Sequence, residues 1–293
     1  MKSTTDLRCC QVSSPDRKSS AFQIGRFSVH LIQDGWFRIP GGSIIRKRSR
    51  NYPNRLLLGL TCLVIRDNQR TILVDTGLGN KPLGDLVSSY GISLPRKLHE
   101  GLGAFGITPK DVDVVILTHL HWDHVGGSTK LDEKGNCLPA FPNAVYLVQQ
   151  AEWDWAMGIP ENNREDFHRE DFLPIQEYQQ LWLIEGSQEV TPGIRVELTG
   201  GHSPGHQVVW IQDDRETALF LADLVPTPKL LNLNRVMKYD NNPEKVIQKK
   251  RDVLERAAAL GAVVVFQHAP RRRMGILHKD NRGAIQLERI LSS

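Results

Sequence analysis

The chain has 293 residues, of which 40% are hydrophobic and 24% are charged, and its formal net charge is +4. These values are ordinary for a soluble globular protein near the upper size of one domain. The longest apolar run, at 257–266, is too short to cross a bilayer, and a mildly basic charge does not by itself indicate nucleic-acid binding. Neither a membrane nor a nucleic acid is therefore an expected partner.

The ends and cysteines of the chain indicate one domain with a tail. Residues 1–20 are polar and lack the apolar segment of a secretory leader, so we expect a flexible tail on a cytoplasmic protein. Residues 21–293 contain no repeat or low-complexity linker and are expected to form a single domain. The cysteines are too few and too scattered for a disulfide framework: Cys9, Cys10, Cys62 and Cys137. Of the two basic runs, 46–50 is expected to be a solvated face, whereas 271–273 could steer an anion.

In chain order, alternating apolar and polar residues come first. They predict the strands of a meander at 22–35 and 55–77, with turns at Asp34-Gly35 and at 67–69. Helical spacing that ends in a glycine then predicts two helices, at 81–91 and 94–106. A continuous apolar strand at 111–119 and a strand leading into a helix at 144–157 complete the first half.

The second half begins with a polar, charged and weakly periodic segment at 158–180. We expect this segment to be an excursion with one helix near its end. Three short strands follow, at 194–201, 206–214 and 217–224. The last elements are an amphipathic helix at 242–261, a strand at 262–268 and a final helix from about Ala284.

The order of these elements predicts the fold class. Strands followed by helices occur twice, which suits two sheets packed face to face with helices outside, each half of the chain contributing one layer. We therefore expect an α/β protein with a four-layer αββα sandwich, in which helices flank two mixed β-sheets.

The stretch THLHWDHVGG at 118–127 places three histidines and an aspartate within six positions. Each neutral imidazole has a ring nitrogen with a lone pair that needs a partner, and a bound cation can be that partner. His119 and His121 lie two apart on extended chain and can point the same way. Asp123 and His124 follow at a turn allowed by two glycines. One tetrahedral zinc cannot easily take all four side chains, so the motif favours two metals.

Further ligands are available at three strand ends. They are His202 in GGHSPGH, Asp223 in LFLADLVP and His268 in VVVFQHAP. Each one alone is better explained as a satisfied histidine or a capping aspartate. Together they favour metal ligation, because a buried carboxylate needs compensation and residues at strand ends converge on one edge.

This combination of HxHxDH, a Gly-His turn, a strand-end aspartate and a strand-end histidine resembles the metallo-β-lactamase superfamily from about residue 22 to the end. The resemblance implies the αββα sandwich and two divalent metal ions, with zinc as the first choice and iron, manganese or cobalt as alternatives. It also implies a ligand set: His119, His121 and His202 for one metal, Asp123, His124 and His268 for the second, and Asp223 as the bridge. Asp75 in LVDTG would orient a ligand histidine, and His206 would support the site without binding metal.

Within the superfamily, the segments GHSPGHQ, ADLVPT and FQHAP are similar to the lactonase-like branch, which includes quorum-quenching N-acyl homoserine lactonases. The resemblance implies attack of a metal-bridging hydroxide on an ester or lactone carbonyl, with Asp123 holding the water and passing its proton to the leaving group. Such lactonases carry a tyrosine three residues after the bridging aspartate, where this chain has Pro226. Either Tyr239, the metals alone or another donor replaces that tyrosine, or the substrate differs.

Other functions remain open on the same residues. A phosphodiesterase or phosphotriesterase could use the same metal pair, with Arg271 and its neighbours to 273 binding the anion. A metal-binding protein without catalysis is a third alternative, disfavoured because no ligand is missing, and a thioester hydrolase of the glyoxalase II type is a weaker fourth. The expected partner is a small-molecule ester, lactone or phosphoester. Relatives often form homodimers, so 158–180 is expected to be a lid or a dimer contact.

Overall fold

The computed structural model describes residues 19–40, 43–45, 55–93, 97–160, 165–271, 273–281 and 283–288. Residues 1–18 of the predicted tail, with Cys9 and Cys10, and the basic run at 46–50 lie outside the described residues. The predicted end of the tail at residue 20 is slightly late, because Ser19 and Ser20 already belong to strand β1 (Ser19–Ile24).

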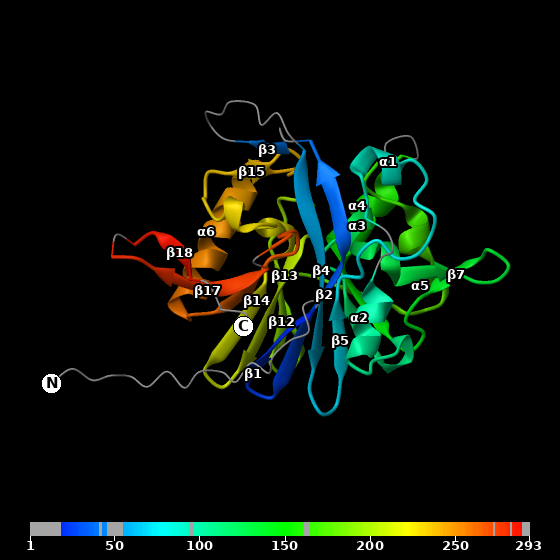
Figure 1. The fold of residues 1–293 in the computed structure, drawn as a ribbon, viewed down its shortest axis with the longest axis horizontal. Helices are drawn as coiled ribbons and strands as arrows, with labels where there is room; N and C mark the ends of the chain where they lie inside the picture. Colours follow the sequence, from blue (N-terminus) through cyan, green and yellow to red (C-terminus); the bar gives the residue numbers. More distant parts are fainter. Residues whose placement is uncertain are drawn as a thin grey trace.

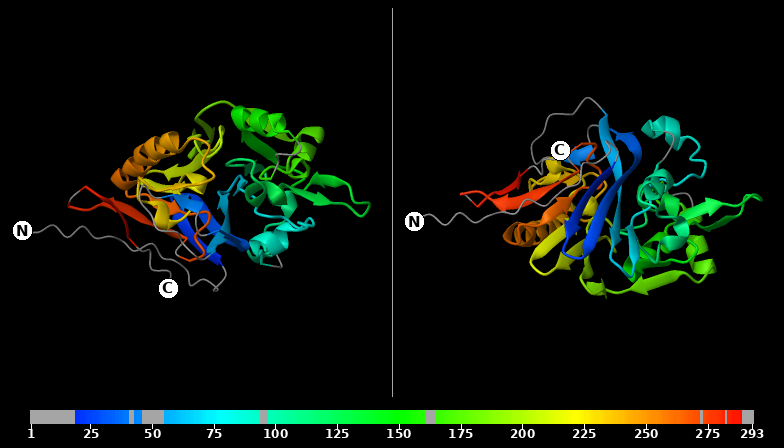
Figure 2. Two further views of the ribbon diagram at one scale, coloured as in Figure 1. Left: turned by 90° about the horizontal axis from the view of Figure 1, so that it is seen from above. Right: turned by 60° about the horizontal axis from the view of Figure 1, so that its bottom comes forward.

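Two seven-stranded sheets pack face to face with helices on their outer sides, which confirms the predicted αββα sandwich (Figures 1 and 2). In spatial order, the first sheet contains β1, β2 (Phe27–Ile39), β4 (Leu56–Arg66), β5 (Thr71–Val74), β6 (Val114–Ile116), β9 (Val145–Gln149) and β10 (Leu181–Ile184). The second contains β11 (Gln188–Thr191), β12 (Ile194–Leu198), β13 (Gln207–Asp213), β14 (Glu216–Phe220), β16 (Val263–Val265), β17 (Met274–Lys279) and β18 (Ile285–Glu288). Both sheets are mixed, since each contains parallel and antiparallel pairs.

Helices form the two outer layers (Figure 1). The first sheet is covered by α2 (Leu98–Ala104), α4 (Gln150–Gly158) and α5 (Leu173–Glu177), and the second by α6 (Pro243–Ala259). The remaining short elements are the helices α1 (Leu86–Tyr90) and α3 (Trp122–Val125) and two small sheets, β3 (Ile44–Ile45) with β15 (Val236–Met237) and β7 (Thr129–Leu131) with β8 (Cys137–Pro139). No helix in the described ranges is long and apolar enough to span a membrane.

Strand β4 illustrates how the layers hold together. Successive side chains of a strand point to opposite faces. Cys62 and Val64 pack among residues of the helical layer, whereas Leu63 and Ile65 pack between the two sheets. A strand covered on both faces must be apolar at consecutive positions, which accounts for the run LLLGLTCLVI.

Helix α6 has the boundaries that its sequence predicts. The side chain of Asn242 accepts a hydrogen bond from the backbone N–H of Lys245 at 3.0 Å, and Pro243 occupies the first helical position. Val246 and Val253 are buried against the second sheet. The apolar face of this amphipathic helix therefore forms part of the core.

The predicted helix from Ala284 is wrong, because β18 forms a hairpin with β17 at this point. Ile285 and Leu287 pack against the core, and the intervening Gln286 is exposed. This is the period of a strand, but four residues are too few to distinguish it from a helix by pattern. The prediction also missed the strands β3, β7, β8, β10, β11, β15 and β17.

The predicted turn at Asp34-Gly35 is also wrong. Strand β2 continues through these residues with an irregular register between Gln33 and Gly35. Asp34 is fully buried, and its carboxylate accepts backbone hydrogen bonds from Leu78 at 3.0 Å and from Lys97 and Leu98 at 2.8 Å each. The aspartate therefore anchors the start of α2 and the loop after β5, rather than initiating a turn.

The excursion at 158–180 contains the helix predicted near its end, α5, although residues 161–164 lie outside the description. It is anchored by a buried ion pair between Asp171 and Lys81 at 2.9 Å. The Lys81 ammonium also donates to the carbonyl oxygen of Gly126 at 2.6 Å. The later part of the excursion is thereby tied to the loop that follows α3.

We predict that Asp34→Ala lowers the free energy of unfolding by about 3 kcal/mol, because it leaves buried N–H groups without an acceptor. Urea denaturation measures this value. Asp67→Ala is the matched control, since Asp67 accepts two backbone N–H groups at 2.8 Å in an exposed turn, and its loss should cost less than about 1 kcal/mol. Equal losses in the two variants would contradict the anchoring role of Asp34.

Candidate metal centre

The predicted ligands meet at the ends of strands from both sheets. His119 and His121 follow β6 of the first sheet, and the short helix α3 presents Asp123 and His124. The others come from the second sheet: His202 from the loop between β12 and β13, Asp223 after β14 and His268 after β16. Strands of both sheets must therefore be in place before these side chains can meet.

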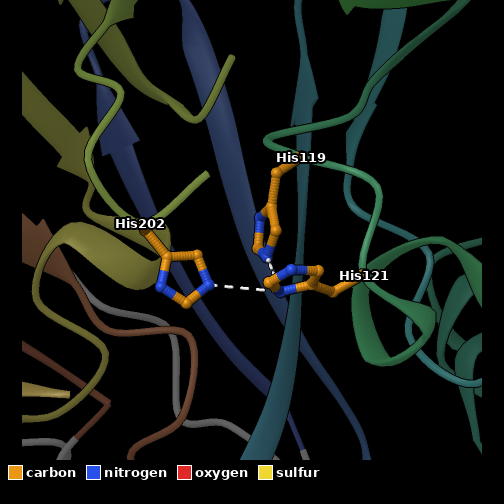
Figure 3. Close-up of side chains that lie close together, drawn as sticks. All are labelled: His119, His121 and His202. Atoms are coloured by element: carbon orange, nitrogen blue, oxygen red, sulfur yellow. Dashed lines mark hydrogen bonds between the residues drawn. The ribbon is translucent and has the colours of Figure 1, made fainter. Parts of the chain in front are cut away.

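Three overlapping groups of side chains have ligand atoms within 4.8 Å of one another. The groups are His119, His121 and His202; His119, His124 and Asp223; and Asp123, His124 and His268. All seven predicted ligands are thus brought together, and only His121 is not classed as buried. Figure 3 shows the first group, in which Nδ1 of His121 lies 2.9 Å from Nε2 of His119 and 3.2 Å from Nε2 of His202.

Hydrogen bonds on the far side of the rings fix where their lone pairs point. His202 Nδ1 lies 2.9 Å from a carboxylate oxygen of Asp240, which can only accept. His119 Nδ1 lies 3.1 Å from the Thr118 hydroxyl, which itself donates to Asp75 at 2.9 Å. Both histidines therefore carry hydrogen on Nδ1 and direct an Nε2 lone pair into the group.

When both rings are neutral, the same arrangement in the third group brings two lone pairs into direct conflict. His124 Nδ1 donates to Asp75 at 2.9 Å, and His268 Nδ1 donates to the carbonyl oxygen of Gly59 at 2.8 Å. Their two Nε2 atoms then face each other at 3.2 Å. Two nitrogens bound to one tetrahedral zinc are about 3.3 Å apart, so this spacing fits a shared cation.

Asp223 lies between the first and third groups. Its Oδ2 atom is 3.2 Å from Nε2 of His202, and its Oδ1 atom is 3.0 Å from Nε2 of His268 and 3.6 Å from that of His124. Without protonated histidines, the buried Oδ1 atom accepts no hydrogen bond from a described residue. Each carboxylate oxygen therefore faces a different set of histidines and requires positive charge beside it.

The pKa values show how the metal-free chain meets this requirement. Burial lowers the pKa of His202 and His268, but the carboxylate of Asp223 and hydrogen bonds outweigh it and raise both values to about 9. Burial and the neighbouring histidines hold the pKa values of His119 and His121 well below the usual range. Burial opposes ionisation of Asp223, but the surrounding histidines lower its pKa well below the usual range. In the metal-free chain, protons on His202 and His268 thus supply part of the positive charge that a bound cation would supply.

His206 supports the loop that carries Asp223. Its Nε2 atom accepts the backbone N–H of Asp223 at 3.0 Å, and its Nδ1 atom lies 2.6 Å from the hydroxyl of Thr199. His206 belongs to none of the three groups. Its position agrees with a supporting role, and Asp75 likewise contacts a predicted ligand, His124.

The prediction missed two buried carboxylates that organise the site, Asp240 and Glu152. Glu152 lies in α4 and accepts the backbone N–H of Leu120 at 3.0 Å and that of Gly205 at 2.9 Å. These amides belong to the loops that carry the histidines of the first group, so Glu152 links the two loops. Within the helical pattern QAEWDWAM, nothing distinguishes this glutamate from a solvent-exposed one.

A cavity of about 60 Å³ opens onto the clustered ligands. Its wall includes Asp166 and Tyr239, whose hydroxyl is 2.7 Å from that of Ser43. Pro226 and Arg271 instead line a neighbouring cavity of about 770 Å³. Arg271 is therefore not among the described residues around the small cavity, and position 272 lies outside the description.

Comparison with known proteins identifies the family. The model of the metallo-beta-lactamase superfamily matches residues 57–268, well over half of the chain. The chain belongs to this superfamily.

Individual relatives agree with this assignment. N-acyl homoserine lactonase AiiA of Bacillus thuringiensis subsp. kurstaki is 33% identical over 180 residues, which are 58% of this chain and 65% of that protein. The match thus spans less than two thirds of the curated relative. A probable metal-dependent hydrolase from Staphylococcus aureus superposes with a TM-score of 0.81 at 25% identity, covering 92% of this chain and 99% of the other. A mutant of B. thuringiensis AiiA with N-decanoyl-L-homoserine at its active site gives a TM-score of 0.66 at 25% identity, covering 83% and 93%.

We predict that metal affinity rises with pH up to about 9. His202 and His268, with pKa values of about 9 without metal, carry protons below that pH and must lose them to bind a cation. Each displaced proton should weaken binding about tenfold per pH unit as the pH falls. Competition with a chromophoric chelator from pH 6.5 to 8.5, corrected for the chelator's own protonation, measures this slope. An affinity independent of pH would contradict the proposed displacement.

We predict that Asp240→Asn weakens metal retention by about 10- to 100-fold, because an amide cannot accept from both His202 and the backbone N–H of Met237. Elemental analysis after dialysis against a graded chelator series measures the loss. Asp132→Asn is the control, since Asp132 accepts backbone N–H groups in an exposed turn and belongs to none of the three groups of predicted ligands. Retention equal to that of the unmodified chain would show that Asp240 only shapes its own loop.

Proposed function

We propose that this chain is a metal-dependent hydrolase with a dinuclear centre that cleaves an ester or lactone bond. An N-acyl homoserine lactone is the specific candidate substrate, because the relatives that match the chain at 33% identity are named N-acyl homoserine lactonases. The single observation that carries the proposal is the convergence of seven buried or half-buried ligand side chains whose lone pairs face one another.

In this proposal, the ligands divide between two metals. His119, His121 and His202 would hold one metal, Asp123, His124 and His268 would hold the other, and Asp223 would contribute to both. The separate orientation of the two Asp223 oxygens supports this division. The mixed nitrogen and oxygen donor set favours zinc and would also accept iron, manganese or cobalt.

A divalent metal pair supplies acidified water at neutral pH and polarises a carbonyl group. We assign the proton transfer to Asp123, whose carboxylate lines the small cavity and would take a proton from water and return it to the leaving oxygen. Tyr239 lines the same cavity and would donate its hydroxyl hydrogen to the carbonyl oxygen. It would thereby replace the lactonase tyrosine, whose place is taken by Pro226.

The alternatives receive less support. A phosphodiesterase was suggested by Arg271 and its neighbours, yet the described residues that line the small cavity include neither arginine nor lysine. A thioester hydrolase would use the same residues and is distinguished only by assay. We retain as proposals that 21–293 acts as one hydrolase domain and that 158–180 serves as a lid or dimer contact.

Metal content and hydrolysis measured on the same sample test the proposed function. We expect close to two metals per chain and opening of an acyl homoserine lactone, with at least a 100-fold loss in His121→Ala and Asp123→Ala. The matched control is His278→Ala, which removes an exposed histidine of β17 and should leave activity unchanged. If the chain hydrolyses only a phosphodiester or only a thioester, that compound class replaces the lactone as the proposed substrate. A chain that binds no metal in metal-replete medium would overturn the proposal.

A further inference from the structure

The larger cavity adjoins the candidate metal centre. It has a volume of about 770 Å³ and shares Ile39, Leu58 and Met237 with the wall of the small cavity. The two cavities therefore have part of their wall in common.

The same segments that carry the ligands also build this cavity. Residues 226–230 follow Asp223, and residues 269–271 follow His268. Between Cα atoms, three residues span at most about 11 Å, so Arg271 is within reach of a substrate of moderate length. The geometry thus couples what binds in the cavity to what reacts at the ligands.

The walls and rim of the cavity differ in character. Trp36, Leu57 and Leu230 give it apolar walls, whereas Arg38, Lys229 and Arg271 are exposed cations. No acidic side chain occurs among the described residues that line it. Within the described part of the chain, the three cations form no ion pair with a carboxylate, unlike Arg256, which pairs with Glu197 at 2.6 Å.

We propose that the cavity selects a substrate in which an apolar segment extends from the ester or lactone and ends in an anionic group. The apolar walls bind the segment, and Arg38, Lys229 and Arg271 bind the anion. This inference rests on the proposed function, since it assumes that the reacting bond lies at the metal ligands. A second possible occupant, an uncharged acyl chain of the same length, becomes an outcome of the test.

The test compares two γ-lactones with side chains of equal length, one ending in a methyl group and the other in a carboxylate. We expect the unmodified, metal-loaded chain to favour the carboxylate about fivefold in kcat/KM at low salt, because exposed ion pairs contribute modestly. The preference should fall towards one in the double variant Lys229→Gln with Arg271→Gln, and it should decrease with added salt. The kcat/KM values for the two lactones are compared within each variant, because a change in metal content or folding affects both values equally and cancels in their ratio.

The matched control is Arg70→Gln with Lys110→Gln, which removes the same charges from exposed positions outside the cavity and should retain the preference. A preference for the methyl-ended lactone, or a ratio equal in both double variants, would overturn the inference while leaving the proposed function intact. Hydrolysis of neither lactone would instead count against the proposed function.

A binding measurement separates these two failures. Decanoate and decanol are titrated into the metal-loaded chain, with tryptophan fluorescence as the readout and Trp36→Phe identifying the signal from the cavity. We expect decanoate to bind about fivefold more tightly than decanol and the Lys229→Gln, Arg271→Gln variant to lose this difference. A difference that persists in the variant would show that the carboxylate binds at the metals, and no difference in the unmodified chain would also overturn the inference.

Discussion

The whole site depends on the neutralisation of converging lone pairs. Carboxylates and a carbonyl group on the outer side hold one ring hydrogen of each of His124, His202 and His268, so the inner nitrogens of the neutral rings can only accept. Asp223 adds a buried negative charge between them. In the metal-free chain, protons on His202 and His268 provide part of the compensation. The outer acceptors therefore orient the rings and at the same time create the demand for a cation.

Both sheets of the sandwich contribute side chains to this cluster. The predicted ligands after β6 belong to the first sheet, and those after β14 and β16 belong to the second, so their spacing depends on how the sheets pack. Glu152 strengthens this dependence, because one carboxylate accepts from the loop of His121 and from the loop of His202. Burial raises the pKa of Glu152, and the hydrogen bonds from the backbone N–H groups of Leu120 and Gly205 partly offset that shift. A buried carboxyl group thus holds together the two loops that carry the histidines.

The sequence predicts the layers of the fold and the side chains that cluster at the strand ends, because both leave local patterns. Apolar strands are covered on both faces, and each predicted ligand directly follows such a strand or lies in a tight turn. Asp240 and Glu152 could not be found this way, since a lone carboxylate in a polar or helical segment carries no periodicity. The turn predicted at Asp34 is wrong for a related reason. The pair Asp-Gly indicates a turn locally, whereas the backbone N–H groups that donate to the Asp34 carboxylate lie in loops distant in the sequence. Strand β18 was lost because its described part is only four residues long.

The separation of the ligands along the chain has a consequence for assembly. His124 and His268 are 144 residues apart, yet their Nε2 atoms are 3.2 Å apart. A cation bound to both would stabilise the folded chain through its affinity for the assembled site, because the two histidines come together only on folding. During synthesis, the first histidines emerge long before this partner exists. The centre can be completed only after His268 has left the ribosome, so metal incorporation is expected to be among the last steps of folding.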